Sequence, residues 1–230
     1  MDAVESQAVH ELENGREMDQ PTFHRLYKRT PEGFKAELIG GIVHVMASPV
    51  SARHGRSHAR IVYWLSMYSE ETPGTEGLDD TTNILARKSE PQPDACLYVL
   101  PENGGSVTFD KDGYLKGAAD LVVEVANSTT SIDLGRKKED YERYGVREYV
   151  VVLAKEESAR WFVRSEEKFH ELEAERDGIF RSAAFPGLWL DPRGLFAPTT
   201  RLLSSALRRG LASPEHGKFV AALRRKLQSK

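Results

Sequence analysis

The sequence predicts one α/β domain in which a mixed sheet is flanked by helices. Two apolar runs, at 120–126 and 148–154, have the length and the continuous apolar character of central strands. Between them, the segment from about Leu134 to Tyr144 has helical spacing and is followed by Gly145. Because a strand, a helix and a second strand in this order are typical of a crossover unit, we expect part of the sheet to be parallel.

Length and composition support a globular protein with one sizeable core. The chain has 230 residues, of which 40% are hydrophobic. It has no run close to the roughly 18 to 20 apolar residues of a membrane helix, and its N-terminus is acidic where a signal or transit peptide would be basic. We therefore expect a soluble, cytoplasmic protein without a membrane partner. The single cysteine, Cys96, excludes an internal disulfide and multi-thiolate metal sites, and its apolar neighbours predict that it is buried.

The two ends of the chain carry opposite charge. Residues 1–20 hold six acidic residues against one arginine, whereas residues 201–230 hold eight Lys or Arg against one glutamate. We interpret residues 1–20 as an acidic flexible lead-in with little that could pack, 21–195 as the main domain and 196–230 as a basic helical extension. The basic extension could bind nucleic acid through phosphate contacts or form the solvated face of a terminal helix, and both alternatives stay open.

The N-terminal half of the main domain predicts a helix, a hairpin and a longer helix. "PTFHRLYKRT" has apolar residues at helical spacing and opens with a proline. In "FKAELIGGIVHVMAS", two strand-like stretches flank Gly40-Gly41, which is a hairpin signal. "SARHGRSHARIVYWLSMYSEE" again has helical spacing and is followed by a Pro-Gly stop.

The remaining stretches predict further strands and two terminal helices. "TNILARK" and "DACLYVL" have the character of strands, and "ARWFVR", "KFHELEA" and "GIFRSA" fit an antiparallel extension of the sheet. The last thirty residues predict two helices joined near Ser213-Pro214.

A carboxylate inside an apolar strand and a lysine on the next helix form a candidate ion pair. Glu124 lies between valines, where an isolated charge costs several kcal/mol unless a cation meets it; the alternative is a strand end that reaches water. Counting about 100° per residue from Leu134, Lys137 falls at about 300° and Tyr141 at about 340°, so Lys137 lies on the packed face. Lys137 is therefore an available partner for Glu124. A lysine that extends its ammonium to water is the alternative.

Two more carboxylates occupy strand positions. Asp94 stands at the entrance of a buried strand after a Pro-X-Pro turn, where turn chemistry alone could account for it. By strand alternation, Glu37 faces away from Ala36 and Leu38, and a solvated strand residue is its ordinary alternative. Carboxylate oxygens suit Mg²⁺ or Mn²⁺, which are bound together with waters and substrate phosphate. A lysine beside such an ion can orient or deprotonate an attacking water.

These residues resemble a known nuclease pattern. Pro93-Asp94 opening a strand, with the acid Glu124 in an apolar strand 30 residues later, resembles the PD-(D/E)XK nuclease superfamily. Four stretches in order resemble, more narrowly, the Uma-two family of restriction endonucleases: "AELIGGIVHVMASPVSARHGR", "QPDACLYV", "DLVVEVANSTTSIDLGRKKEDYERYGVREYVVV" and "FPGLWLD". The superfamily pattern has a lysine two residues after the acid, where this chain has Ala126. In the Uma-two family the lysine lies on the following helix, and the matching position is Lys137.

The resemblance implies a restriction-endonuclease-like fold and a Mg²⁺-dependent (or Mn²⁺-dependent) endonuclease that hydrolyses nucleic-acid phosphodiester bonds, with DNA as the expected substrate. Asp94 and Glu124 would hold the metal, and Lys137 would position or activate the water. Glu37 would take a second metal or orient Lys137. A non-catalytic module of the same fold, binding nucleic acid or protein, is the alternative function.

A basic segment at the start of a predicted helix is a candidate phosphate-binding site. Arg53, His54 and Arg56, followed by His58 and Arg60, lie near the helix N-terminus, where backbone N–H groups favour anions. Solvated side chains are the alternative. Because many relatives in the superfamily act as dimers, the resemblance also implies a homodimer.

Overall fold

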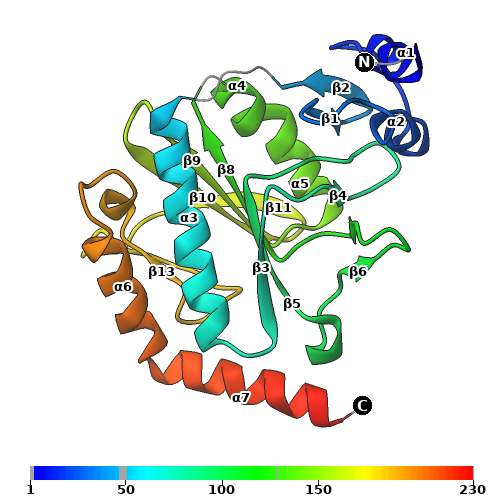
Figure 1. Cartoon of the computed structure of the whole chain (residues 1–230). Coiled ribbons are helices and arrows are strands. Elements are labelled where there is room, and N and C mark those ends of the chain that lie inside the picture. The colour runs from blue at the N-terminus through cyan, green and yellow to red at the C-terminus, as the bar shows by residue number, and fades with distance from the viewer. Residues whose placement is uncertain (1–2, 47–50, 128, 230) are drawn as a thin grey trace.

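The computed structural model describes residues 3–46, 51–127 and 129–229, and its centre is a six-stranded mixed sheet (Figure 1). In spatial order the strands are β11 (Lys168–Leu172), β10 (Ser158–Ser165), β9 (Glu148–Leu153), β8 (Leu121–Ala126), β5 (Ala95–Val99) and β3 (Thr75–Asp79). Strands β8 and β9 are parallel, and every other neighbouring pair of this sheet is antiparallel. The predicted mixed α/β architecture is confirmed.

The crossover between β8 and β9 is less regular than the sequence predicts. It consists of α4 (Thr130–Ile132), a π-helical turn η2 (Asp133–Lys137) and α5 (Lys138–Tyr144). Helical structure thus begins before Leu134, and Gly135 departs from helical geometry with φ −107° and ψ −105°. Gly145 ends α5 at φ 95°, a left-handed conformation that glycine adopts without steric cost.

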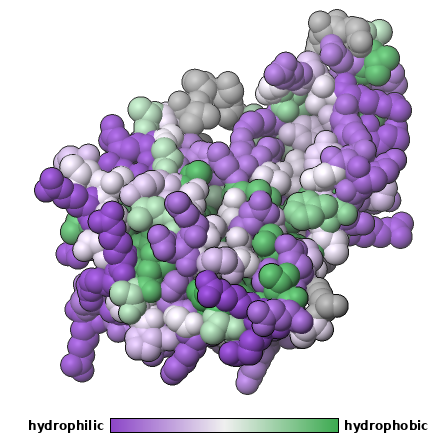
Figure 2. Space-filling model, turned by 60° about the horizontal axis from the view of Figure 1, so that its bottom comes forward, coloured by the Kyte–Doolittle hydropathy of each residue, from purple (hydrophilic) through white to green (hydrophobic). Residues whose placement is uncertain are grey.

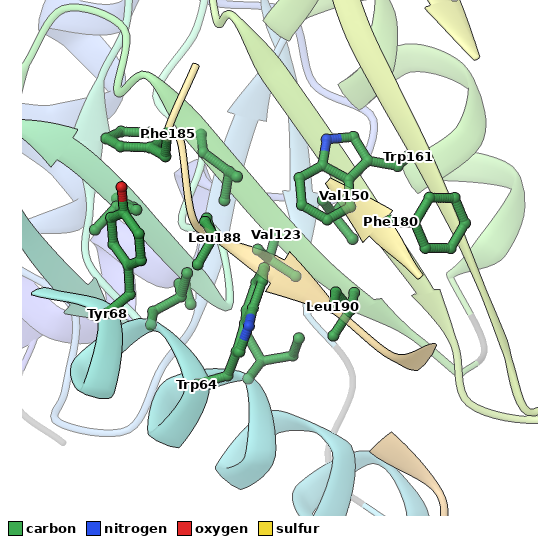
Figure 3. Packing of buried hydrophobic residues seen from close by; sticks show 14 of the residues in the cluster. Trp64, Tyr68, Val123, Val150, Trp161, Phe180, Phe185, Leu188 and Leu190 are labelled. Atoms are coloured by element: carbon green, nitrogen blue, oxygen red, sulfur yellow. The ribbon is translucent and has the colours of Figure 1, made fainter. Parts of the chain in front are cut away.

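One face of the sheet is covered by α3 (Ala52–Glu71), which packs its apolar stripe on the central strands (Figure 3). Trp64 of α3 and Trp161 of β10 are fully buried and meet edge to face, with ring centroids 6.0 Å apart. The indole N–H of Trp64 also donates to the carbonyl of Trp189, at 3.0 Å. Fully burying one large apolar side chain contributes about 1.5–3 kcal/mol, so this layer is a principal source of stability.

The C-terminal helices belong to the same layer. They are α6 (Arg201–Leu211) and α7 (Pro214–Gln228), as predicted, and Ser213 caps α7 by accepting a hydrogen bond from the His216 N–H. Leu203 and Leu207 of α6 join the core that α3 forms with the sheet. The basic side chains of α6 lie on its exposed side, so this helix packs through its apolar side while its charged side faces solvent.

The opposite face of the sheet is covered by α5 and by a small three-stranded sheet. Tyr141 of α5 packs on Tyr149, with ring centroids 5.0 Å apart. The small sheet consists of β4 (Asn83–Ile84), β7 (Leu115–Lys116) and β6 (Thr108–Phe109). The predicted strand at "TNILARK" therefore shrinks to two residues and lies outside the main sheet.

Two other strands depart from the sequence prediction. The strand in "GIFRSA" is β12 (Phe180–Arg181), which pairs with β13 (Trp189–Leu190) in a separate ribbon instead of extending the main sheet. Conversely, β3 is not predicted from the sequence, because "TEGLD" mixes a glycine and two acids with one leucine. Pairing with β5 makes it a strand. The 3₁₀ turns η1 (Pro101–Asn103) and η3 (Pro192–Leu195) complete the elements of these connections.

The N-terminal segment forms a lobe of its own beside the main sheet (Figure 1). It contains α1 (Ala3–Glu11), α2 (Gln20–Tyr27) and the hairpin of β1 (Ala36–Ile39) and β2 (Ile42–Val45). Its small core contains Leu12, Phe23, Leu26, Ala36, Leu38 and Val43. Within residues 3–20, where little packing is expected, Leu12 is nevertheless fully buried in this core beside residues of α2 and the hairpin.

One face of the molecule illustrates how polar and apolar residues are distributed on the surface. The face in Figure 2 is largely hydrophilic, with hydrophobic residues in small separate groups. Among the described residues, no helix combines the length and the apolar character that crossing a membrane requires.

Replacing Leu12 with alanine tests the packing of the N-terminal lobe. We expect Leu12→Ala to lower the free energy of unfolding by about 2–4 kcal/mol, since it empties a fully buried position. Leu227→Ala, at a side chain that is 52% exposed, is the matched control and should change it by less than about 0.5 kcal/mol. Urea unfolding followed by circular dichroism measures both, and equal effects of the two substitutions would contradict the packed lobe.

Candidate functional site

The ammonium group of Lys137 is buried between carboxylates from two different parts of the fold. Its Nζ lies 2.8 Å from Glu37 Oε2 and 3.0 Å from Glu124 Oε1, and 3.9 Å from Asp133 Oδ1. Lys137 is 6% exposed, Glu37 3% and Glu124 4%, which excludes both the solvated and the extended-lysine alternatives. Lys137 and Glu124 form the predicted pair, and Glu37 joins it.

Glu37 connects the N-terminal lobe to the entrance of β5. Its Oε1 accepts a hydrogen bond from the backbone N–H of Gln92 at 2.6 Å, while its Oε2 meets Lys137. The neighbouring Leu38 forms an antiparallel bridge with Glu90. As alternation predicts, Ala36 and Leu38 face the lobe core while Glu37 faces the main domain. Both oxygens of Glu37 thus have a protein partner.

Glu124 lies on the central strand β8, on the face covered by α5. Its Oε1 accepts from Lys137 and also from the hydroxyl of Tyr141, at 2.8 Å. Burial raises the pKa of Glu124 well above its ordinary value, and the attraction of Lys137 offsets this only in part because other carboxylates lie close by. The carboxyl group therefore holds a proton more readily than an ordinary glutamate, and a cation bound beside it would favour its ionised form.

Asp94 lies opposite Glu124 at the end of the sheet. Ala95 pairs with Val123 in the antiparallel register of β5 and β8, and continuing this register by one residue places Asp94 across from Glu124. Opposed side chains share a face, with Cβ atoms typically about 4.5–5.5 Å apart. Asp94 Oδ2 accepts from the Val125 N–H at 2.7 Å, so its bond is to the neighbouring strand and not to its own turn.

The charge of Asp94 is stabilised by these contacts. Burial alone would raise the pKa of Asp94, but hydrogen bonds from His54 and from the Val125 N–H outweigh burial and lower it. Asp94 is consequently ionised at neutral pH, as a metal ligand must be.

Two residues of the site escaped the sequence interpretation. Asp133, at the start of the predicted helix, was not singled out because an acid in that place is ordinarily a cap. It is 2% exposed, and its Oδ2 accepts a hydrogen bond from the Thr129 hydroxyl at 2.5 Å. Tyr141 is placed on the packed face by the sequence but without a role. Asp133, Lys137 and Tyr141 follow one another at intervals of four residues, and this spacing was the signal that could have found them. Burial raises the pKa of Asp133 to about 6.

The residues of the predicted phosphate-binding segment differ in exposure. Arg53 and Arg56 are exposed on the first turns of α3, whereas Arg60 is buried and donates to the carbonyl of Leu195 at 2.7 Å. Arg60 is thus a packing residue and the phosphate interpretation was wrong for it. His54 turns inward: its Nδ1 lies 2.9 Å from the Val125 carbonyl and its Nε2 lies 3.3 Å from Asp94 Oδ1. The role of Arg53 and Arg56 stays a prediction.

The donor set fits a hard divalent cation. Glu37, Asp94, Glu124 and Asp133 bring four carboxylates to one region, and Lys137 supplies a single permanent positive charge. Burial by itself would lower the pKa of Lys137, but the attraction of Glu124 and Glu37 outweighs burial and raises it. The remaining negative charge and the oxygen donors match Mg²⁺ or Mn²⁺. Asp94 and Glu124, on opposed strands, could hold such an ion.

Comparisons with known proteins bear on the family and the fold of the chain. A family model described as "Uma2: Putative restriction endonuclease" matches residues 20–193. A crystal structure from Anabaena variabilis, described as a "putative nuclease belonging to DUF820", superposes with a TM-score of 0.54 at 12% identity. The match covers 80% of this chain and 97% of that one and shows a common fold. None of the curated proteins matches the chain.

The raised pKa of Asp133 predicts a pH-dependent penalty on stability. Between the ordinary value of 3.8 and the folded value of about 6, the folded state binds more protons than the unfolded state. The free energy of unfolding therefore falls as pH rises through this range, by up to about 3 kcal/mol for this group. In Asp133→Asn this loss is absent, so the stability of the variant relative to the wild type should improve from pH 4 to pH 7.

Urea unfolding at both pH values measures this difference. Glu139→Gln, at an exposed acid of α5, is the control and should show no comparable change. A difference between Asp133→Asn and wild type that is equal at both pH values would contradict the interpretation.

Proposed function

Because the chain belongs to the Uma2 family, we propose that it is a metal-dependent endonuclease that hydrolyses phosphodiester bonds in nucleic acid, with DNA as the expected substrate. The observation that carries the proposal is the meeting of Lys137 with Glu37 and Glu124, next to the strand end that presents Asp94. Three segments distant in sequence supply these groups. A convergence of this kind is what cleavage of a charged phosphodiester requires.

A divalent ion, Mg²⁺ or Mn²⁺, held by Asp94 and Glu124 would supply electrostatic stabilisation of the phosphate charge that develops during hydrolysis. The two carboxylates differ in their exposure to solvent and in their contacts. Asp94 has a lowered pKa and a side chain that is 18% exposed, so it is ionised and open to solvent. Glu124 is buried and braced by Lys137 and Tyr141, which fixes its orientation.

Lys137 is proposed to act as a fixed cation and hydrogen-bond donor. Its raised pKa keeps the ammonium protonated at neutral pH, which opposes a role as the base that deprotonates the attacking water. A protonated amine can still orient a water molecule or a phosphate oxygen and stabilise negative charge. Of the two roles that the family resemblance implies for this lysine, the environment favours positioning.

Glu37 is proposed to orient Lys137. One of its oxygens is occupied by the Gln92 N–H and the other by the Lys137 ammonium, so the carboxylate holds the amine at a defined place above the sheet. This arrangement favours the orienting role over a second metal site. Exposed Arg53 and Arg56 flank His54, which contacts Asp94, and they would contact the phosphates on either side of the cleaved bond. A homodimer remains a prediction.

Cleavage assays on site variants test the proposal. Plasmid DNA, single-stranded DNA and RNA are incubated with the full chain and Mg²⁺ or Mn²⁺, and we expect cleavage of at least one substrate. Asp94→Asn and Lys137→Ala should each reduce the rate by a factor on the order of 10² or more, since each removes charge stabilisation at the reacting phosphate. Lys138→Ala is the matched control for the neighbouring lysine, which packs over the Phe162 ring instead of entering the site.

Full cleavage by Asp94→Asn would overturn the proposal. Because loss of Lys137 leaves buried carboxylates without a cation, circular dichroism must first show that each variant is folded. Binding of DNA without cleavage of any substrate, with either metal, would instead support the non-catalytic module.

Glu37→Gln tests the orienting role separately. The amide can keep its oxygen toward the Gln92 N–H but loses the charge that faces Lys137. We expect kcat to fall by about tenfold with little change in KM, because the amine contributes to the transition state more than to substrate binding. A larger effect on KM than on kcat would show that Glu37 acts in binding.

A further inference from the structure

Two histidines of α3 approach the carboxylate of Asp94 from the face of the sheet opposite to Lys137. His54 and His58 are four residues apart, so they lie on one side of the helix, and their ring centroids are 5.8 Å apart. One ligand atom each from His54, His58 and Asp94 can be chosen so that all three lie within 4.8 Å of one another. Nothing in the proposed cleavage of nucleic acid uses the two imidazoles together.

The hydrogen bond from His54 to a backbone carbonyl fixes the role of its Nδ1. Its Nδ1 lies 2.9 Å from the Val125 carbonyl oxygen, which can only accept, so Nδ1 carries the hydrogen. Its Nε2 faces Asp94 Oδ1 at 3.3 Å, where a proton on this nitrogen donates to the carboxylate and a metal ion could take the place of that proton. Metal-binding histidines commonly have this arrangement, in which one nitrogen donates to a backbone carbonyl and the other is directed at the ion.

His58 presents its Nε2 to a second pair of oxygen acceptors. This nitrogen is 2.8 Å from the Asp94 carbonyl oxygen and 2.8 Å from Asp79 Oδ1. Both neighbouring oxygens are acceptors, so a hydrogen on Nε2 must make these contacts. A metal ion in place of that hydrogen would be bound by the same nitrogen and oxygen atoms, which can donate electron pairs to it.

We propose that His54, His58 and Asp94 form a binding site for a first-row transition-metal dication such as Zn²⁺ or Co²⁺, with Asp79 beside it. Bonds of about 2.0–2.2 Å hold tetrahedral ligands about 3.4 Å apart, so side-chain shifts of about 1 Å would close the site. The side chains of His54, His58 and Asp94 are 21%, 24% and 18% exposed, which leaves room for these shifts and for entry of the ion.

Ligand chemistry separates this site from the one between Asp94 and Glu124. Imidazole nitrogens suit Zn²⁺, Co²⁺ and Ni²⁺, whereas carboxylate oxygens suit Mg²⁺ and Mn²⁺. Two histidines and one carboxylate leave a coordination position open for water or for a further oxygen such as that of Asp79. The inference concerns metal binding and does not depend on the proposed nuclease activity.

Titration of the metal-free full chain with Co²⁺, followed by its visible absorption and by calorimetry, tests the proposal without nucleic acid. We expect one Co²⁺ ion to bind per chain, with visible absorption bands typical of Co²⁺ bound by nitrogen ligands. His54→Gln and His58→Gln should each weaken binding by about tenfold or more. His170→Gln, at an exposed histidine of β11, is the matched control and should bind as the wild type does.

Glu124→Gln separates the two sites. This variant should retain Co²⁺ binding, because Glu124 belongs only to the carboxylate site. Unchanged binding in both His54→Gln and His58→Gln, or loss of binding in Glu124→Gln alone, would overturn the proposal. Since both histidines are partly exposed, their variants are expected to fold, and thermal unfolding without metal verifies this.

Discussion

The buried ammonium of Lys137 is the interaction on which the arrangement of this molecule depends. Glu37 and Glu124 hold it from two sides at 2.8 and 3.0 Å, and all three groups are nearly inaccessible to water. An isolated ion at such a depth would be unstable, and removing one partner of a buried pair typically costs about 3–5 kcal/mol. The hairpin, the central strand and the crossover helix must therefore come together for any one of these charges to be tolerated.

Irregular local structure is the means by which the chain meets this constraint. The π-helical turn at Asp133–Lys137, with the unusual geometry of Gly135, precedes the α-helical part of the crossover and directs Lys137 toward β8. On the other side, the N–H of Gly40 in the hairpin turn donates to Asp140 Oδ2 of α5 at 2.7 Å. The hairpin is thus fastened to the crossover at two points, and Glu37 lies at the more deeply buried one.

The sequence was sufficient to predict the pairing of charged residues that lie in apolar segments. Glu124 among valines required a cation, and helical spacing placed Lys137 within reach even though the real turn is not α-helical. The contact of Asp94 with Val125, the fully buried Leu12 and strand β3 were beyond such reasoning, because each depends on a partner distant in the chain. Asp133 was missed for another reason: a carboxylate at a helix start has the same sequence signature whether it caps the helix or enters a site.

Asp94 explains why the sheet presents its charges at this end. Its Oδ2 is held by the Val125 N–H, and its Oδ1 faces His54, so the two oxygens reach toward different groups. The side chains of Glu37 and Glu124 are each only 5% exposed, whereas that of Asp94 is 18% exposed. An ion or a phosphate group from solution must therefore meet Asp94 before it meets the buried pair. A carboxylate inside the strand could not do this, and one further out in the loop would lose the backbone contact that keeps it charged.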